Sequence, residues 1–224
     1  MQTDSLRDEP GRQEPPRMSR RAIRPAPIQR LDTPRPPFDR ITRGLHWATA
    51  FLVLALFAAA WLHALAEEQK SDFTLFLLQV HRSIGVIVWT LVAVRVTWRL
   101  TFARLPPFPP QMSNLHRTAV KASEYALYAL LLSQPVTGLF TTLFGGRAFA
   151  LLIWQVPPLL PRDEAIRDAF HAAHELGAWT LAALVVLHAG VALFHHLVLR
   201  DDVLACMAPG IATSRTGKAS WRGE

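Results

Sequence analysis

Four long apolar blocks dominate the pattern of hydrophobic and polar positions along the chain. The blocks cover residues 47–65, 73–94, 125–144 and 176–199, and polar or Pro-rich segments separate them. Each block has about 19 to 24 residues, the length that an α-helix needs to cross roughly 30 Å of hydrocarbon. The pattern therefore predicts an all-α membrane protein built as a four-transmembrane-helix bundle.

The segments outside the blocks suggest three regions. Residues 1–38 combine Pro, Gly and Arg without apolar periodicity, which predicts a disordered Arg/Pro-rich extension. Residues 39–206 form the predicted membrane domain, and residues 207–224 a disordered C-terminal tail. Within the membrane domain, residues 147–171 form an outer loop long enough to fold over the mouth of the bundle. A small-residue sequence before Glu67 resembles a signal-peptide cleavage site, but the basic segment that precedes this block is too long for an n-region, so we expect the block to be retained.

The basic residues are concentrated in alternate segments outside the apolar blocks. The formal net charge is +7, and residues 1–43 hold ten Arg against six acidic residues, while residues 95–121 hold five basic residues and no acidic one. The other connections are less basic, since residues 66–72 have three acidic residues and one Lys, and residues 145–170 have three of each sign. This alternation fits the positive-inside rule with both termini in the cytoplasm. We therefore expect membrane lipid, and no nucleic acid, as the partner of the basic charge.

Histidines occur at matched depths in the predicted spans. His174 and His188 are fourteen residues apart, which advances a helix by about 21 Å and nearly four turns, so both rings lie on one face. His46 opens the first span at cytoplasmic depth, level with His188, and His81 lies near the start of the second span at outer depth, level with His174. The spacing and topology together predict two bis-histidine sites stacked across the membrane.

Haem is the cofactor that fits this arrangement best. A flat macrocycle needs axial ligands on facing helices and small residues beside them, and Gly85 and Gly177 lie on the ligand faces of His81 and His174. Zinc or copper would favour ligands clustered in one place, and the single Cys206 excludes a thiolate cluster. With both axial positions filled, electron transfer is favoured over oxygen binding.

Several histidines allow other readings. A single His in a span is often a polar contact between helices, and His171 could replace His174 as the ligand. His195 and His196 could line a proton or quinone path at the inner surface, or form an ordinary interfacial pair. His63 and His116 are expected at the surface.

Arg82 adjoins His81 at outer depth. It could bind a haem propionate, or draw an anion toward the outer site by electrostatic focusing. The alternative is a guanidinium that reaches out to the membrane interface.

The motifs of the spans together resemble a known family. Over about residues 38–210, the chain is similar to the prokaryotic cytochrome b561 family, through "RITRGLHWATAFLVLALFAAAWL", "VHRSIGVIVWTLVAVRVTWRL", "QPVTGLF" and "HELGAWTLAALVVLHAGVALFHHLVLRDDVLACMAP". The chain departs from the family pattern in its long N-terminal extension, and in Glu124, which stands where members often carry a histidine.

The resemblance implies a bundle enclosing two haem b groups in the bacterial inner membrane, with His46 and His188 holding the cytoplasmic-side haem and His81 and His174 the outer-side haem. It also implies a quinone-linked oxidoreductase that oxidises superoxide at the outer face, where Arg82 is the candidate catalytic residue, with ubiquinone as the electron acceptor. Two other functions stay open: a membrane-anchor cytochrome b subunit that links a peripheral dehydrogenase of hydrogenase or formate dehydrogenase type to the quinone pool, and a non-redox membrane interaction protein.

Overall fold

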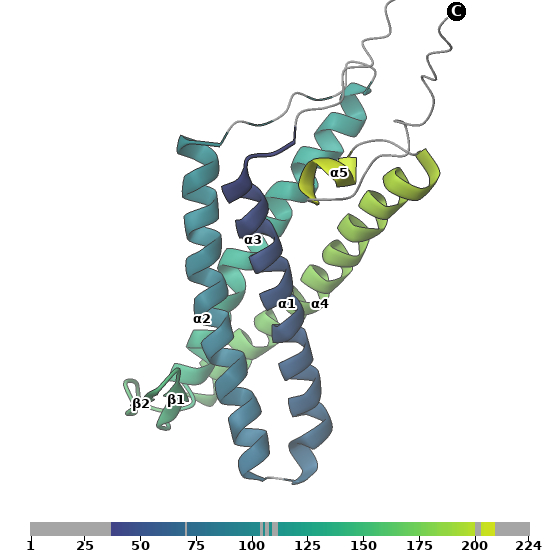
Figure 1. The fold of residues 1–224 in the computed structure, drawn as a ribbon. Helices are drawn as coiled ribbons and strands as arrows, with labels where there is room; N and C mark the ends of the chain where they lie inside the picture. Colours follow the sequence, from purple (N-terminus) through teal and green to yellow (C-terminus); the bar gives the residue numbers. More distant parts are fainter. Residues whose placement is uncertain are drawn as a thin grey trace, which may run out of the picture. The chain divides into compact units, whose positions relative to one another are not determined.

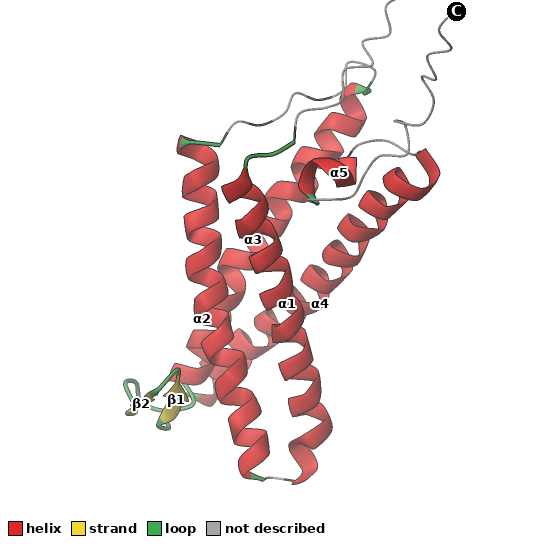
Figure 2. Cartoon of the chain, viewed as in Figure 1, coloured by secondary structure: helices red, strands yellow, loops and turns green. Residues whose placement is uncertain are grey.

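The computed structural model describes residues 37–69, 71–103, 105, 108, 112–199 and 203–208. Most of the predicted N-terminal extension, and the tail from residue 209, lie outside the described residues. The described part contains four helices long and apolar enough to cross a membrane (Figure 1; Figure 2), which confirms the prediction of four spans. They are α1 (Arg40–Ala66), α2 (Asp72–Thr101), α3 (Asn114–Leu143) and α4 (Glu164–Phe194), and a π-helical turn, η2 (His195–Leu199), extends α4.

The helices are longer than the apolar blocks because polar residues cap them outside those blocks. Asp39 accepts a hydrogen bond from the Thr42 amide at 2.8 Å, and Ser113 and Asp163 cap α3 and α4 in the same way, which satisfies amides that have no partner inside the helix. Because α4 begins at Glu164, the outer loop is shorter than the predicted segment 147–171.

A small β-hairpin occupies the outer loop, and the sequence pattern did not predict it. Strands β1 (Phe149–Leu151) and β2 (Trp154–Val156) pair antiparallel. The Gln79 side chain of α2 donates to the Leu152 carbonyl, and the Leu152 amide donates to the Ser83 hydroxyl, both at 2.8 Å. Gln79 and Ser83 are four residues apart and so lie on one face of α2. The turn of the hairpin is thereby fixed to α2.

The four helices pack as two pairs. α1 packs along α2, α3 packs along α4, and α2 also contacts α3, whereas α4 makes few close backbone contacts with α1 or α2. Val53, Val88 and Val92 form the buried centre of the α1–α2 contact. Stacked rings of Phe140 and Phe170, with centroids 4.8 Å apart, join the end of α3 to the start of α4. Most other apolar side chains of the spans face outward, as a helix surrounded by lipid requires.

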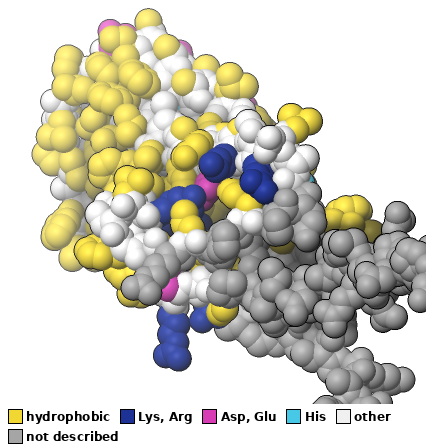
Figure 3. Space-filling model, turned by 90° about the horizontal axis from the view of Figure 1, so that it is seen from above, with side chains coloured by type: hydrophobic (Ala, Val, Ile, Leu, Met, Phe, Trp, Pro, Cys, Tyr) yellow, Lys and Arg dark blue, Asp and Glu magenta, His cyan; other side chains and the backbone are white. Residues whose placement is uncertain are grey.

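The two ends of the bundle differ. At the end where α1 and α3 begin and α2 and α4 finish, here called the basic end, Lys and Arg side chains gather beside an apolar flank (Figure 3). The hairpin lies at the opposite end, here called the hairpin end. A short helix, α5 (Val203–Met207), is joined to the start of α1 by hydrogen bonds from the Phe38 amide to the Cys206 carbonyl and from Trp47 Nε1 to the Met207 carbonyl. The folded part therefore extends slightly beyond the predicted boundaries at 39 and 206.

Candidate cofactor sites

Two histidine pairs connect α4 to the first two helices. His46 of α1 lies beside His188 of α4 at the basic end, and His81 of α2 lies beside His174 of α4 at the hairpin end, with ring centroids 6.2 Å apart in both pairs. His171 is exposed, and it forms none of the ring contacts found among the described residues. The imidazoles thus reach across helices whose backbones make few close contacts.

The distance within each pair fits one shared metal ion. An imidazole nitrogen binds a metal at about 2 Å, and the ring centre lies about 1 Å further back, so two rings on opposite sides of one ion have centres about 6 Å apart. Both observed separations match this value. A flat macrocycle around such an ion also needs the surrounding backbones to stand apart, which is the relation of α4 to α1 and α2.

The hairpin-end pair has the hydrogen bonds of metal-binding histidines. His81 Nδ1 lies 3.1 Å from the Leu56 carbonyl oxygen, and His174 Nδ1 lies 3.0 Å from the Gln134 carbonyl oxygen. Because a carbonyl can only accept, each Nδ1 carries the ring proton and each Nε2 keeps a free lone pair. A hydrogen bond from the second nitrogen to a carbonyl is the usual way that proteins orient a metal-bound imidazole.

Residues of α3 support His174, and the sequence interpretation gave them no role at this site. A Cβ atom at Gly138 would lie 3.0 Å from His174 Cε1, and Thr137 Oγ1 lies 3.2 Å from His174 Nδ1. Gln134, Thr137 and Gly138 are spaced i, i+3 and i+4, which places them on one helix face. The sequence "QPVTG" contains this spacing, so the shared helix face could have been predicted.

A proline lies in the same segment of α3. Pro135 lacks an amide and so removes one donor from the helix. The carbonyls of Leu132 and Gln134, which both precede Pro135, accept hydrogen bonds from Trp89 of α2 and His174 of α4. This segment of α3 therefore holds side chains from two other helices.

The two predicted cofactor-contacting glycines have different surroundings. A Cβ atom at Gly85, on the His81 face of α2, would meet no atom within 4 Å, so space is open there. A Cβ atom at Gly177 would overlap the side-chain amide of Gln134. Gly177 therefore accommodates α3, in contrast to the expectation that it leaves room for a macrocycle.

The basic-end pair is arranged differently from the hairpin-end pair. Arg95 Nη2 of α2 lies 3.0 Å from His46 Nδ1. A guanidinium can only donate, so Nδ1 accepts, and in the neutral ring the proton lies on Nε2. Arg95 also lies over the Tyr128 ring, and one turn further along Arg99 pairs with Glu124 at 2.5 Å. His188 is the exposed member of the pair.

Sequence interpretation missed Arg95, although a signal for it was present. Arg95 follows His81 by fourteen residues, the same interval that separates His174 from His188. It therefore shares the helix face of His81 at the depth of His188.

Arg82 is partly covered by the hairpin. Its Cζ atom lies 5.6 Å from the centre of the Phe149 ring, and no carboxylate among the described residues forms an ion pair with it. Arg82 thus keeps an unneutralised charge next to His81.

Two histidines expected at the surface have closer contacts. His63 is partly buried, and its Nδ1 atom has no hydrogen-bond partner among the described residues. At the basic end, the rings of His116 and His195 lie 5.9 Å apart, and His195 is buried.

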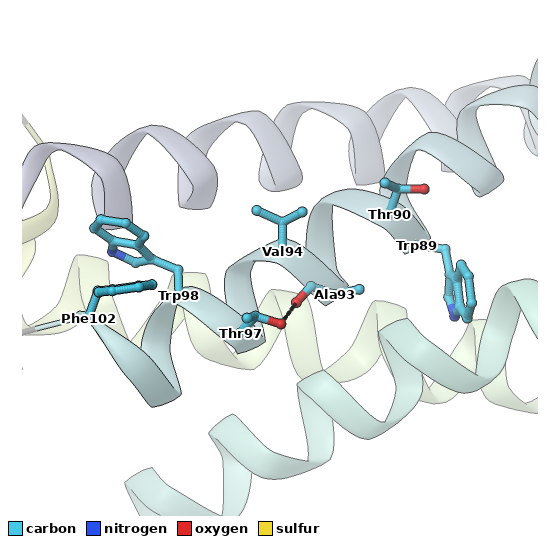
Figure 4. A pocket seen from close by; sticks show the side chains of 7 residues that line it. All are labelled: Trp89, Thr90, Ala93, Val94, Thr97, Trp98 and Phe102. Atoms are coloured by element: carbon cyan, nitrogen blue, oxygen red, sulfur yellow. Dashed lines mark hydrogen bonds between the residues drawn. The ribbon is translucent and has the colours of Figure 1, made fainter.

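A shallow apolar groove of about 380 Å³ runs along α2 (Figure 4). It contains none of the histidines and lies apart from both pairs. Its lining residues are Trp89, Thr90, Ala93, Val94, Thr97, Trp98 and Phe102.

Comparison with known proteins agrees with this architecture. The family described as Prokaryotic cytochrome b561 matches residues 37–210. Cytochrome b561 homolog 2 of Escherichia coli (strain K12) is 31% identical over 75% of this chain and 88% of its own length, and cytochrome b561 homolog 1 of the same organism is 28% identical over 77% and 97%. A probable superoxide oxidase CybB of Yersinia pestis is 25% identical over 74% of this chain and 92% of its own length.

Proposed function

Because the chain belongs to the prokaryotic cytochrome b561 family of membrane electron-transfer proteins, we propose that it is a di-haem b, quinone-linked oxidoreductase. In this proposal His81 and His174 hold one haem at the hairpin end, and His46 and His188 hold a second at the basic end. The observation that carries the proposal is the pair of equal 6.2 Å ring separations, at two depths along one helix.

A haem held by these histidines would supply one-electron redox chemistry. The protein's own residues then fix position and surroundings. The Leu56 and Gln134 carbonyls hold the histidine tautomers at the hairpin end.

We propose that the electron donor is superoxide at the hairpin end, and that ubiquinone is the acceptor. Two superoxide ions would give up one electron each and leave as O₂, while one quinone would take up two electrons and two protons to form a quinol. Arg82 would attract the anion, since it is a partly buried cation with no carboxylate partner among the described residues. The similar protein of Yersinia pestis, a probable superoxide oxidase, supports this choice of donor.

The proposed location is the bacterial inner membrane. The basic end would face the cytoplasm under the positive-inside rule, with both termini on that side. The hairpin end and Arg82 would then face the outer aqueous phase, from which superoxide would approach.

A haem count in purified protein tests the ligand assignment. We expect two haem b groups per chain by the pyridine haemochrome assay, one in His81→Ala or His174→Ala, and one in His46→Ala or His188→Ala. His171→Ala is the matched control and keeps two. A wild-type protein without haem would refute the proposal, and loss of haem in His171→Ala in place of His174→Ala would refute the assignment at the hairpin end.

Superoxide-driven ubiquinone reduction tests the role of Arg82. We expect Arg82→Ala to lower the rate and to flatten its dependence on salt, because screening weakens attraction between separated charges. A rate and salt dependence equal to those of the wild type would exclude this role. Co-purification with a large dehydrogenase, combined with no activity toward superoxide, would instead favour the anchor-subunit function.

A further inference from the structure

The basic-end pair contains a cation that the proposed function leaves without a task. Arg95 lies within α2, at the depth of His46 and His188, and its side chain is only partly exposed. Charged residues inside membrane spans are costly and usually mark a functional site with a specific partner. The identity of that partner is therefore informative.

No carboxylate among the described residues forms an ion pair with Arg95. The acidic residue nearest along α3, Glu124, is paired with Arg99 through contacts of 2.5 and 2.7 Å. The contacts that Arg95 does make are with neutral rings, namely His46 Nδ1 at 3.0 Å and the face of Tyr128 at 5.4 Å. The charge is held between α1 and α3 without a carboxylate in direct contact among the described residues.

The contact with His46 conflicts with iron binding by that residue. When Nδ1 accepts from the guanidinium, the neutral ring carries its proton on Nε2, the nitrogen that an iron ion would need. In the hairpin-end pair, both Nδ1 atoms donate to carbonyls and no such conflict exists. Binding of haem at the basic end therefore requires Arg95 to leave His46.

We propose that Arg95 is the anion-binding residue of the basic-end site and that its partner is a haem carboxylate. In the arrangement described here the guanidinium occupies His46 Nδ1, and on haem binding it transfers to the carboxylate and releases His46 as a ligand. A guanidinium suits this role because its planar fork matches a carboxylate. The inference rests on the proposed function and deepens it.

The test compares Arg95→Gln, Arg95→Lys and a control of unchanged net charge, the double variant Arg99→Gln/Glu124→Gln, in the full-length protein. Each is also made with His174→Ala, so that the basic-end haem alone is observed. A unit positive charge within about 10 Å, at an effective dielectric constant of about 20, changes the equilibrium of a redox centre by more than tenfold. We expect Arg95→Gln to make reduction of the basic-end haem at least tenfold less favourable, a midpoint potential lower by about 59 mV or more, or to lose this haem.

Arg95→Lys keeps the charge and is expected to restore most of the potential and the haem. The Arg99→Gln/Glu124→Gln control removes the neighbouring ion pair without changing the net charge, and it is expected to match the wild type. Unchanged potential and haem content in Arg95→Gln would overturn the inference, and so would equal losses in all three variants. If the wild type binds no haem, the proposed function fails first, so the two failures are distinguishable.

Discussion

Gly138 offers the sharpest test of how α3 positions His174. Ordinary van der Waals contact for a Cβ atom begins near 3.4 Å, and a Cβ at Gly138 would lie 3.0 Å from His174 Cε1 and 3.2 Å from Nδ1. In Gly138→Ala the imidazole must therefore retreat by a few tenths of an ångström. Retreat lengthens the 3.0 Å hydrogen bond to the Gln134 carbonyl.

The two consequences of this substitution have opposite signs. Alanine in place of glycine stabilises a helix interior by about 0.8 to 1 kcal/mol, so the free energy of unfolding should fall little or rise. Loss of an outer hydrogen bond to a metal ligand typically costs about 10- to 100-fold in metal affinity. With His174 as a haem ligand, as proposed, we expect the haem affinity of the hairpin-end site to fall at least tenfold, while that of the basic-end site is unchanged.

Haem titration of the apoprotein in detergent, together with thermal unfolding of the same samples, measures both effects. Gly190→Ala is the control, because a Cβ there would meet no atom within 4 Å; its haem content and affinity should equal those of the wild type. Two haems bound with wild-type affinity in Gly138→Ala would refute the reasoning. A large loss of thermal stability would show instead that the helix contact, and not the ligand, had failed.

Two further predictions concern the ends of the bundle. Gln79→Ala combined with Ser83→Ala removes both hydrogen bonds to Leu152, each worth about 1 kcal/mol. We expect proteolysis within residues 149–156 to become faster while the haem content stays constant. An unchanged cleavage rate would contradict this prediction. Burial raises the pKa of the Asp39 carboxyl, but the hydrogen bonds that it accepts, those from Thr42 among them, together lower this pKa. Its capping contribution of about 1 kcal/mol should therefore be present above about pH 4 and lost as the pH falls through the lowered pKa. Thermal unfolding of Asp39→Ala against the wild type should show a difference that disappears in acid, and a difference constant with pH would exclude the carboxylate as its source.

The spans were predictable because one physical requirement, the burial of about 20 apolar residues in lipid, leaves a continuous signal. The depths of His174 and His188 followed from helix geometry alone. The early start of α4 could not be read from hydropathy, since Glu164 and its neighbours extend the helix beyond the apolar block and Asp163 caps it.

The supporting residues were harder to predict because they depend on contacts between helices. The hairpin is fixed by two side chains of α2 that are distant in sequence, Gln79 and Ser83. Gly177 lies against the Gln134 side chain because α3 packs along α4. Arg95 contacts His46 because α2 packs along α1. Periodicity defines the face of a helix on which a residue lies but not the neighbour that it meets.

Under the proposed function, the fourteen-residue interval on α4 would also make electron transfer sensitive to the membrane voltage. It spans at most about 21 Å of a hydrocarbon layer about 30 Å thick. Under the proposed function, an electron passing between the two depths would cross up to about two thirds of the membrane field, worth about 1.6 kcal/mol per 100 mV. An energised membrane, negative inside, would therefore oppose inward transfer and hold electrons nearer to the hairpin.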